Sequence, residues 1–334
     1  MDRIPDPERP TIATSMHSLL KGDDVCIRAL PRNLERTTVK RGFAFNILVV
    51  GRYDLGQEEL IETLFGIELD KKTPDELSSY NLQRHTTEVT DGPVKLNLEI
   101  MSTPNFGTKI NDTNSYKPVI REVQKRMHKH LHNESQLYRK QDTPDERFHV
   151  CLYLLSPSGP KYGIHPNDEI LLKKLTEYCN VIPIIARSDM LTTSEVEERK
   201  MQIRKALESL PIYQMPKGDE ERDEIEWINH LNKIRSKQPF ACMNRKYDVD
   251  AWFKDYNPLN EEFSDTKVLQ AALIAHMCDL VDSTHYEHYE AFRAEELQRE
   301  AVQSPRYDMS MSEAEMVRLR MSEIRDSRKV GIDI

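Results

Sequence analysis

The stretch FAFNILVVGRYDLGQEELIETLF, residues 43–65, decides the fold of this chain. Its first part, residues 43–50, is a short apolar run followed by glycine, which predicts a buried central strand. Its last part, residues 58–65, has apolar side chains at helical spacing. Between the two parts lie Gly51 and Gly56, in the GxxxxG spacing of a phosphate-binding loop. A strand, a turn and a helix are therefore expected in that order.

Glycines at both ends of such a loop allow backbone N–H groups to wrap a phosphate at the N-terminus of the following helix. The spacing alone is weak, because it occurs often by chance, but its position directly after a buried strand raises its value. The other interpretation is that Gly51 and Gly56 are present only because the turn requires them. That interpretation needs no ligand and stays open.

Outward from this stretch, strand and helix patterns alternate. Strands are predicted at residues 94–100, 148–155, 181–186 and 239–243, and helices at 167–178, 194–210 and 266–300. Ser194 and Glu197 match a capping box at the start of the second of these helices. Strands separated by helices of this length indicate βαβ units, and therefore an α/β domain with a mainly parallel sheet.

The chain has 334 residues, enough for one large α/β domain with terminal extensions. We expect the domain at residues 42–297, an N-terminal extension at 1–41 and a short C-terminal tail at 298–334. Two charge-dense stretches, 70–84 and 216–237, are predicted to be surface loops or insertions.

The composition argues against several classes of protein. A net charge of −9 and a pI near 5.7 disfavour a dedicated nucleic-acid binder. No run approaches the roughly 18 apolar residues of a membrane span, and the start of the chain lacks the apolar core of a signal peptide. The five cysteines are scattered without a CxxC pair, so reduced thiols in a cytoplasmic protein are expected.

Five segments, taken in chain order, resemble signature segments of the septin family. They are VKRGFAFNILVVG (39–51), HLHNESQLYRK (130–140), RFHVCLYLLSPSG (147–159), NVIPIIARSDMLT (180–192) and LIAHMCDLVDSTHYEHYEAFRAEEL (273–297). The second and the last are typical of septins rather than of small GTPases in general. The resemblance covers roughly residues 30–297. It implies a P-loop GTPase-like three-layer α/β/α domain with a mainly parallel sheet and a septin-type terminal helical extension.

The resemblance also implies partners and a place in the cell. Septins assemble with other septin subunits into hetero-oligomers and filaments at the cell cortex or division site. A cytoskeletal role in cytokinesis is therefore expected. The family builds one filament contact from its terminal helices and the other around its nucleotide pocket. A chain that cannot hold nucleotide would have to make the second contact differently, or cap a filament there.

The phosphate side departs from the family's pattern. Where the family's loop ends in Gly-Lys-Ser/Thr, this chain has Gly56, Gln57 and Glu58. Gln57 lacks the charge-assisted bond of the lysine to phosphate, worth about 1.5–3 kcal/mol. Glu58 would place a carboxylate near phosphate and metal, a repulsion of about 4 kcal/mol at ~4 Å and an effective dielectric near 20. Unless Glu58 turns outward, the two changes predict a loss of roughly three to five decades in affinity.

The family's second motif, Asp-Thr-Pro-Gly, is replaced here by the run from Ser102 to Asn105. The aspartate that orders the metal's water shell is absent, and so is the glycine that approaches the γ-phosphate, so Mg²⁺ is not expected. The motif that contacts the base of the nucleotide, here called the base side, matches the family more closely than the phosphate side does. The family's Ala-Lys-Ala-Asp reads Ala-Arg-Ser-Asp, with Arg187 and Asp189 left for base contacts, and Arg245 matches its Arg-x-Tyr.

These departures predict a pseudoGTPase in which no catalytic residue is assigned, GTP hydrolysis is lost and no cofactor is expected. Weak GTP or GDP binding stays open as a residual property of the base side. A slow GTPase and a membrane adaptor that does not polymerise are the alternative functions.

A basic segment precedes the first strand and contains Arg32, Arg36, Lys40 and Arg41. Septins carry a polybasic segment at this place that is associated with anionic membrane lipids. Each basic side chain near such a surface adds about 1 kcal/mol, which would give reversible attachment. An ordinary solvated or interface segment is the equally weighted alternative.

Two further patterns are interpreted without a functional site. His128, His130 and His132 fall on a predicted helix without a carboxylate or thiol beside them, so we expect a surface helix and no metal site. The tail from Met311 to Ile324 holds about two heptads, too few for a coiled coil that is stable alone.

Overall fold

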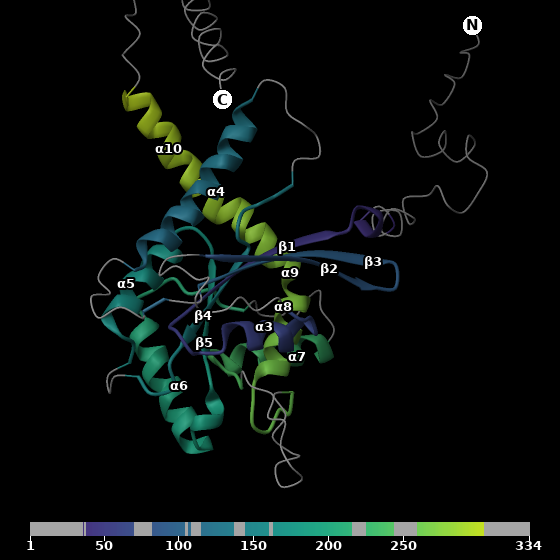
Figure 1. Ribbon diagram of the computed structural model, residues 1–334, viewed down its shortest axis with the longest axis vertical. Helices are drawn as coiled ribbons and strands as arrows, with labels where there is room; N and C mark the ends of the chain where they lie inside the picture. Colours follow the sequence, from purple (N-terminus) through teal and green to yellow (C-terminus); the bar gives the residue numbers. More distant parts are fainter. Residues whose placement is uncertain are drawn as a thin grey trace, which may run out of the picture. The chain divides into compact units, whose positions relative to one another are not determined.

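The computed structural model describes residues 36, 38–69, 82–103, 106–107, 115–136, 144–159, 163–215, 225–243 and 259–303, with side chains up to residue 299. The chain divides into two compact units, Met1–His288 and Tyr289–Ile334. The sheet lies in the first unit, and Figure 1 shows its strands and helices.

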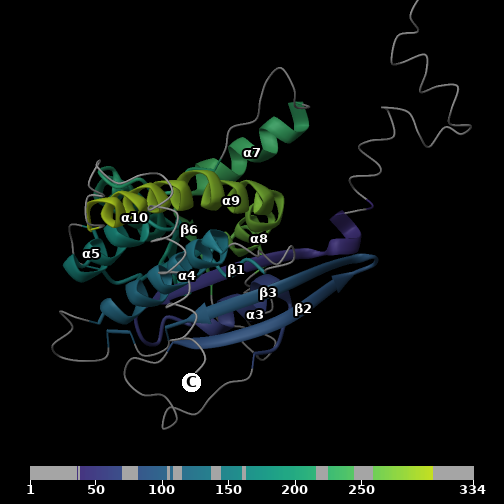
Figure 2. The same cartoon turned by 90° about the horizontal axis from the view of Figure 1, so that it is seen from above.

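Within the described residues, six strands form one sheet in the order β2-β3-β1-β4-β5-β6. Their bounds are β1 Phe43–Gly51, β2 Gln83–Asp91, β3 Val94–Ser102, β4 Val150–Leu155, β5 Asn180–Ile185 and β6 Phe240–Ala241. Only β2 runs antiparallel, against β3, and Figure 2 shows the two as a long ribbon. All other pairs are parallel, so the carboxyl ends of β1, β3 and β4 meet at one edge. This confirms the mainly parallel sheet.

The described part of the first unit includes the helices α3 Gln57–Phe65, α4 Lys117–Ser135, α5 Pro166–Leu175, α6 Thr193–Leu207, α7 Ile225–Lys237, α8 Thr266–Ala275 and α9 Met277–Ser283. A π-helical turn, Thr284–Tyr289, follows α9, and α10 is Glu290–Gln303. The predicted helix 266–300 is thus interrupted at His276 and again at the π-helical turn.

Two apolar cores flank the sheet, because side chains alternate along each strand. Ile47 and Val49 of β1 pack into the core that holds α3, α8 and Ile234 of α7. Leu48 and Val50 of the same strand pack into the core that holds α4, α5 and α6. The predicted three-layer α/β/α architecture is therefore confirmed.

Three local predictions were wrong or incomplete. The capping box of α6 is formed by Thr192 and Glu195, with the helix starting at Thr193, and not by Ser194 and Glu197. The stretch 216–237 was expected to be loop, but its second half is α7. The stretch 70–84 overlaps the start of β2, and its residues 70–81 lie outside the described residues.

No helix in the described ranges combines the length and the apolar character that crossing a bilayer requires. The tail from Met311 to Ile324 lies outside the described residues.

Candidate functional site

The predicted phosphate loop lies at the carboxyl end of β1, between Gly51 and the start of α3. Both of its glycines have a structural reason. A Cβ on Gly51 would lie 2.7 Å from Cβ of Leu154 on β4, closer than packing allows. Gly56 caps α3 with a φ of 71°, in the left-handed region that favours glycine. Strand packing at Gly51 and the left-handed helix start at Gly56 therefore account for the GxxxxG pattern whether or not a phosphate binds.

The side chain of Gln57 is folded into this loop. It is 7% exposed. Its Nε2 donates to the carbonyl oxygen of Gly51 at 2.6 Å and to that of Thr103 at 3.2 Å, and its Oε1 accepts from the backbone N–H of Thr103 at 3.2 Å. A neutral amide thus occupies the inner side of the loop and joins the end of β1 to the end of β3.

A second set of hydrogen bonds holds the same two strand ends together. Thr103 is 4% exposed, and its hydroxyl accepts from the backbone N–H of Gly51 and donates to the carbonyl of Val49, both at 3.4 Å. Sequence reasoning assigned no role to this threonine. Asn105, which it did single out, lies outside the described residues.

The first turn of α3 carries two carboxylates, Glu58 and Glu59. The N-terminus of a helix has a partial positive charge, which favours a bound anion or an acidic side chain. In this chain, acidic side chains of the helix itself stand at that end. These carboxylates offset part of the positive charge that, in other phosphate loops, attracts the ligand.

The base-side motif reaches back to the phosphate loop. Nη1 of Arg187 lies 3.2 Å from Oδ2 of Asp54 and 3.4 Å from its carbonyl oxygen. Both residues have left-handed backbones, with φ of 51° and 64°, which non-glycine residues rarely adopt. Asp189 lies on the short 3₁₀ turn Ser188–Met190 that follows, and is half-buried. Arg245 lies outside the described residues.

One further contact of the loop was not foreseen from the sequence. Nε of Arg52 lies 3.4 Å from Oδ2 of Asp168, in the first turn of α5. Burial raises the pKa of Asp168, and the nearby Arg52 guanidinium opposes that rise. The loop is therefore tied to α5 as well as to β3 and to the base-side motif.

The described part of the basic segment is exposed. Arg36, Lys40 and Arg41 all present their side chains to solvent, and residues 38–41 are helical. Arg32 lies outside the described residues.

Metal-ligating side chains do not gather anywhere in the part of the chain that the structure describes, where no group of three or more His, Cys, Asp or Glu could hold an ion. Of the three histidines singled out above, His128 and His132 are exposed on α4, while His130 is half-buried.

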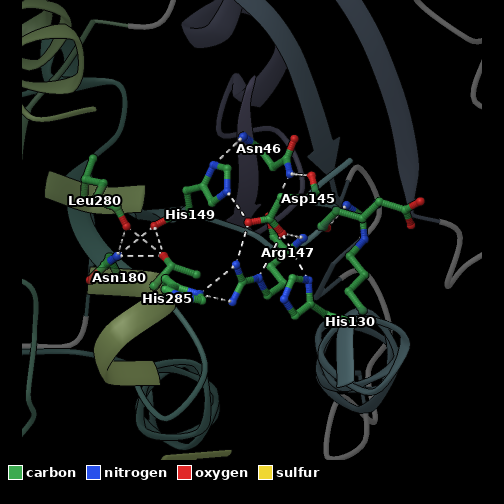
Figure 3. A network of polar contacts seen from close by, with 11 residues as sticks. Asn46, His130, Asp145, Arg147, His149, Asn180, Leu280 and His285 are labelled. Atoms are coloured by element: carbon green, nitrogen blue, oxygen red, sulfur yellow. Dashed lines mark hydrogen bonds and ion pairs between the residues drawn. The ribbon is translucent and has the colours of Figure 1, made fainter. Parts of the chain in front are cut away.

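A polar network lies at the opposite edge of the sheet, near the amino ends of β1, β4 and β5 (Figure 3). Asp145 is at its centre. Its carboxylate accepts from the backbone and guanidinium of Arg147 at 2.7–3.0 Å and from Nε2 of His149 at 3.4 Å. Asn46 of β1 completes it, donating from its backbone N–H to Nδ1 of His149 at 3.1 Å. The edge is thereby cross-linked by polar contacts, and the ring of His149 also stacks on that of Phe45.

The same network holds α9 and the π-helical turn. Asn180 is 2% exposed. Its Nδ2 donates to the carbonyl oxygens of His149 and Leu280, both at 2.9 Å, and to the hydroxyl of Thr284 at 3.1 Å. Arg147 adds contacts of 3.3 and 3.4 Å from its two terminal nitrogens to Nδ1 of His285.

The fold and this site define a class of protein. A glycine loop between β1 and a helix, together with a base-side motif after β5 in a mainly parallel sheet, is the arrangement of P-loop GTPase-like domains. The septin family model matches residues 41–306. The chain belongs to the septin family, and is thus a cytoskeletal septin subunit whose expected partners are other septins.

Individual relatives agree. Neuronal-specific septin-3 of Danio rerio is 33% identical over 294 residues, which cover 81% of this chain and 79% of that protein. Septin-2A of Xenopus laevis is 30% identical over 314 residues, covering 89% and 87%. The crystal structure of Cdc11 from Saccharomyces cerevisiae matches with a TM-score of 0.54 and 26% identity, over 76% of this chain and 100% of that one. Both the predicted family and the predicted fold are confirmed.

Proposed function

We propose that this chain is a structural septin subunit that assembles with other septins into hetero-oligomers and filaments at the cell cortex or division site, with GTP hydrolysis lost. The observation that carries the proposal is the buried amide of Gln57, bonded to Gly51 and Thr103. A side chain that stabilises the loop by itself makes the loop independent of a ligand.

The residues of the loop do not fit a nucleoside triphosphate with Mg²⁺. Gln57 supplies no ammonium group for the phosphates, and Glu58 adds a carboxylate to the same helix turn. Ser102 stands where the family has the aspartate that orders the metal's water shell. The base side keeps Asp189 and Arg187, so weak GTP or GDP binding is the residual alternative.

Exposed Arg36, Lys40 and Arg41 support a further part of the proposal, reversible attachment to anionic membrane lipids. Three such side chains would add about 3 kcal/mol near an anionic surface at about 1 kcal/mol each. That is enough to enrich the subunit at a membrane that already holds septins.

Co-expression with single partner septins, followed by size-exclusion chromatography with light scattering, tests assembly. We expect a stoichiometric complex with at least one partner in buffers free of GTP and Mg²⁺. A chain that stays monomeric with every partner, yet binds anionic liposomes, would favour the non-polymerising adaptor. Steady phosphate release from GTP by the isolated chain would favour the slow GTPase.

A further inference from the structure

A groove of about 600 Å³ lies between α6 and α7, and none of its lining residues belongs to the phosphate loop or to the polar network. Its buried floor is apolar and includes Pro183 of β5, Leu207 of α6 and Ile212 of the segment that follows α6. The exposed rim is polar. A hollow with an apolar floor and a few polar groups is the usual form of a binding site.

Two arginines line this groove, and neither has an acidic partner among the described residues. Arg235 of α7 makes no side-chain hydrogen bond or ion pair with any of them. Arg204 of α6 donates from Nε to the carbonyl of Gln238 at 2.9 Å and from Nη2 to that of Ser236 at 3.1 Å. Its guanidinium is thereby fixed in place while its charge is unpaired. Glu208, the acidic residue of the lining, pairs with neither arginine.

Gln238 provides a third polar group. The residue is 8% exposed, and its Nε2 donates to the carbonyl of Tyr213 at 2.6 Å. That bond fixes the orientation of the amide, and leaves Oε1 as a buried acceptor with no donor. That oxygen is shielded from solvent, so a ligand in the groove does not contact it in this side-chain arrangement.

We propose that the α6–α7 groove binds an extended peptide segment of a partner protein that carries an acidic side chain between apolar residues. The carboxylate would pair with the guanidinium groups of Arg235 and Arg204, since arginine matches carboxylates in geometry and charge. The flanking apolar side chains would cover the floor formed by Pro183 and Ile212.

The positive charge of the groove favours an acidic segment over a basic one. A lysine or arginine in the segment would face two guanidinium groups with only Glu208 to oppose them. A neutral peptide could cover the floor, but it would leave both guanidinium charges unpaired. The preference for an acidic side chain is therefore the property to measure.

The test uses the full chain and two fluorescein-labelled peptides, GLELELG and its neutral match GLQLQLG, with binding followed by fluorescence anisotropy. We expect GLELELG to bind at least about tenfold more tightly, the value of one charge-assisted hydrogen bond. Arg235→Gln should reduce the affinity for GLELELG about tenfold and bring it close to that of GLQLQLG. Lys205→Gln is the matched control, because Lys205 is exposed on α6 next to Arg204 but does not line the groove.

Three results would overturn the proposal: no binding of GLELELG at millimolar concentration, equal binding of the two peptides, or equal losses in the Arg235 and Lys205 variants. Circular dichroism of each variant guards against misfolding. If Arg235→Gln misfolds, Asn232→Asp on the rim of the groove serves instead. The added carboxylate should reduce the affinity for GLELELG and leave the affinity for GLQLQLG unchanged. None of these measurements requires assembly with other septins.

Discussion

Gln57 and Thr103 bond to each other twice: the amide Nε2 of Gln57 donates to the carbonyl of Thr103, and the N–H of Thr103 donates to Oε1 of Gln57, both at 3.2 Å. The pair bridges 46 positions of sequence and joins the phosphate loop to the end of β3. In a GTPase the phosphate loop cradles the phosphates, and the switch segments respond to the γ-phosphate. Here the phosphate loop and the end of β3 are held together by the protein alone, which is the physical basis for the proposed nucleotide-independent subunit.

Gln57→Ala should destabilise the protein. The substitution removes three buried hydrogen bonds and leaves backbone groups of Gly51 and Thr103 with fewer partners. We expect the free energy of unfolding to fall by about 2–3 kcal/mol in urea titrations. Glu59→Gln, in the same helix turn, is the control; it removes one charge from the helix start and should change the free energy of unfolding by less than about 1 kcal/mol. Equal stabilities of wild type and Gln57→Ala would show that the amide does not hold the loop.

Restoring the family's residues should restore affinity for nucleotide. The double variant Gln57→Lys, Glu58→Ser supplies an ammonium group and a hydroxyl and removes a carboxylate from the loop. Because the base side is kept, we expect GDP affinity to rise by at least about a hundredfold in isothermal titration calorimetry. The single variant Glu59→Ser, which changes a neighbouring carboxylate, should leave affinity within about threefold. No gain in the double variant would locate the defect elsewhere than at these two residues.

Asn180→Ala should loosen α9. The buried amide contacts the carbonyls of His149 and Leu280, and its loss leaves both without that donor. We expect the free energy of unfolding to fall by about 3 kcal/mol. Amide hydrogen exchange should accelerate more in peptides that cover α9 than in peptides that cover α3. Asn97→Ala, at an exposed position of β3, serves as the comparison. Uniform loss of protection along the chain would contradict a local role in holding α9.

The polar network also predicts a pH dependence. Burial alone would raise the pKa of Asp145, but hydrogen bonds from His149 and Arg147 outweigh it and hold the pKa well below its ordinary value. A carboxyl group that is more acidic in the folded state than in the unfolded state, about 3.9 there, stabilises above that pH and loses the effect as pH falls. Asp145→Asn should thus cost about 2 kcal/mol at pH 7.

The difference in the free energy of unfolding between wild type and Asp145→Asn should become smaller as the pH falls below about 4. Thermal or urea unfolding from pH 7 to pH 3 measures it. Asp91→Asn, at an exposed end of β2, is the matched substitution and should have little effect. A difference that stays constant down to pH 3 would rule out the Asp145 carboxylate as its source.

Reversing the charges of Arg32, Arg36, Lys40 and Arg41 to Glu should abolish binding to liposomes that contain phosphatidylserine. The expected loss is large because each residue contributes about 1 kcal/mol and reversal doubles the change. Reversal of Lys125 and Lys129, exposed on α4, controls for overall charge. Unchanged sedimentation with liposomes would remove the membrane role of the segment.

Elements with strong local patterns were predicted well from the sequence. The run 43–65 showed β1, the loop and α3 because its apolar spacing changes from that of a strand to that of a helix. β2 was missed because QRHTTEVTD is polar, and the strand forms by antiparallel pairing with β3. α7 was missed because it begins inside a charge-dense stretch.

The site was only half predictable. Substitution of the family's lysine by Gln57 was visible in the sequence, but its bonds depend on backbone carbonyls that β3 brings to the loop. The cap of α6 shows a related limit. Thr192 with Glu195 and Ser194 with Glu197 fit the same pattern, and only the helix start at Thr193 decides between them.

The most direct test of the account is the nucleotide content of the purified chain, released by denaturation and quantified by ion-exchange chromatography. With Gln57 occupying the loop and Glu58 at the helix start, we predict much less than one guanine nucleotide per chain, and no increase after incubation with GTP and Mg²⁺. One mole of GTP or GDP per mole of chain would contradict the central claim.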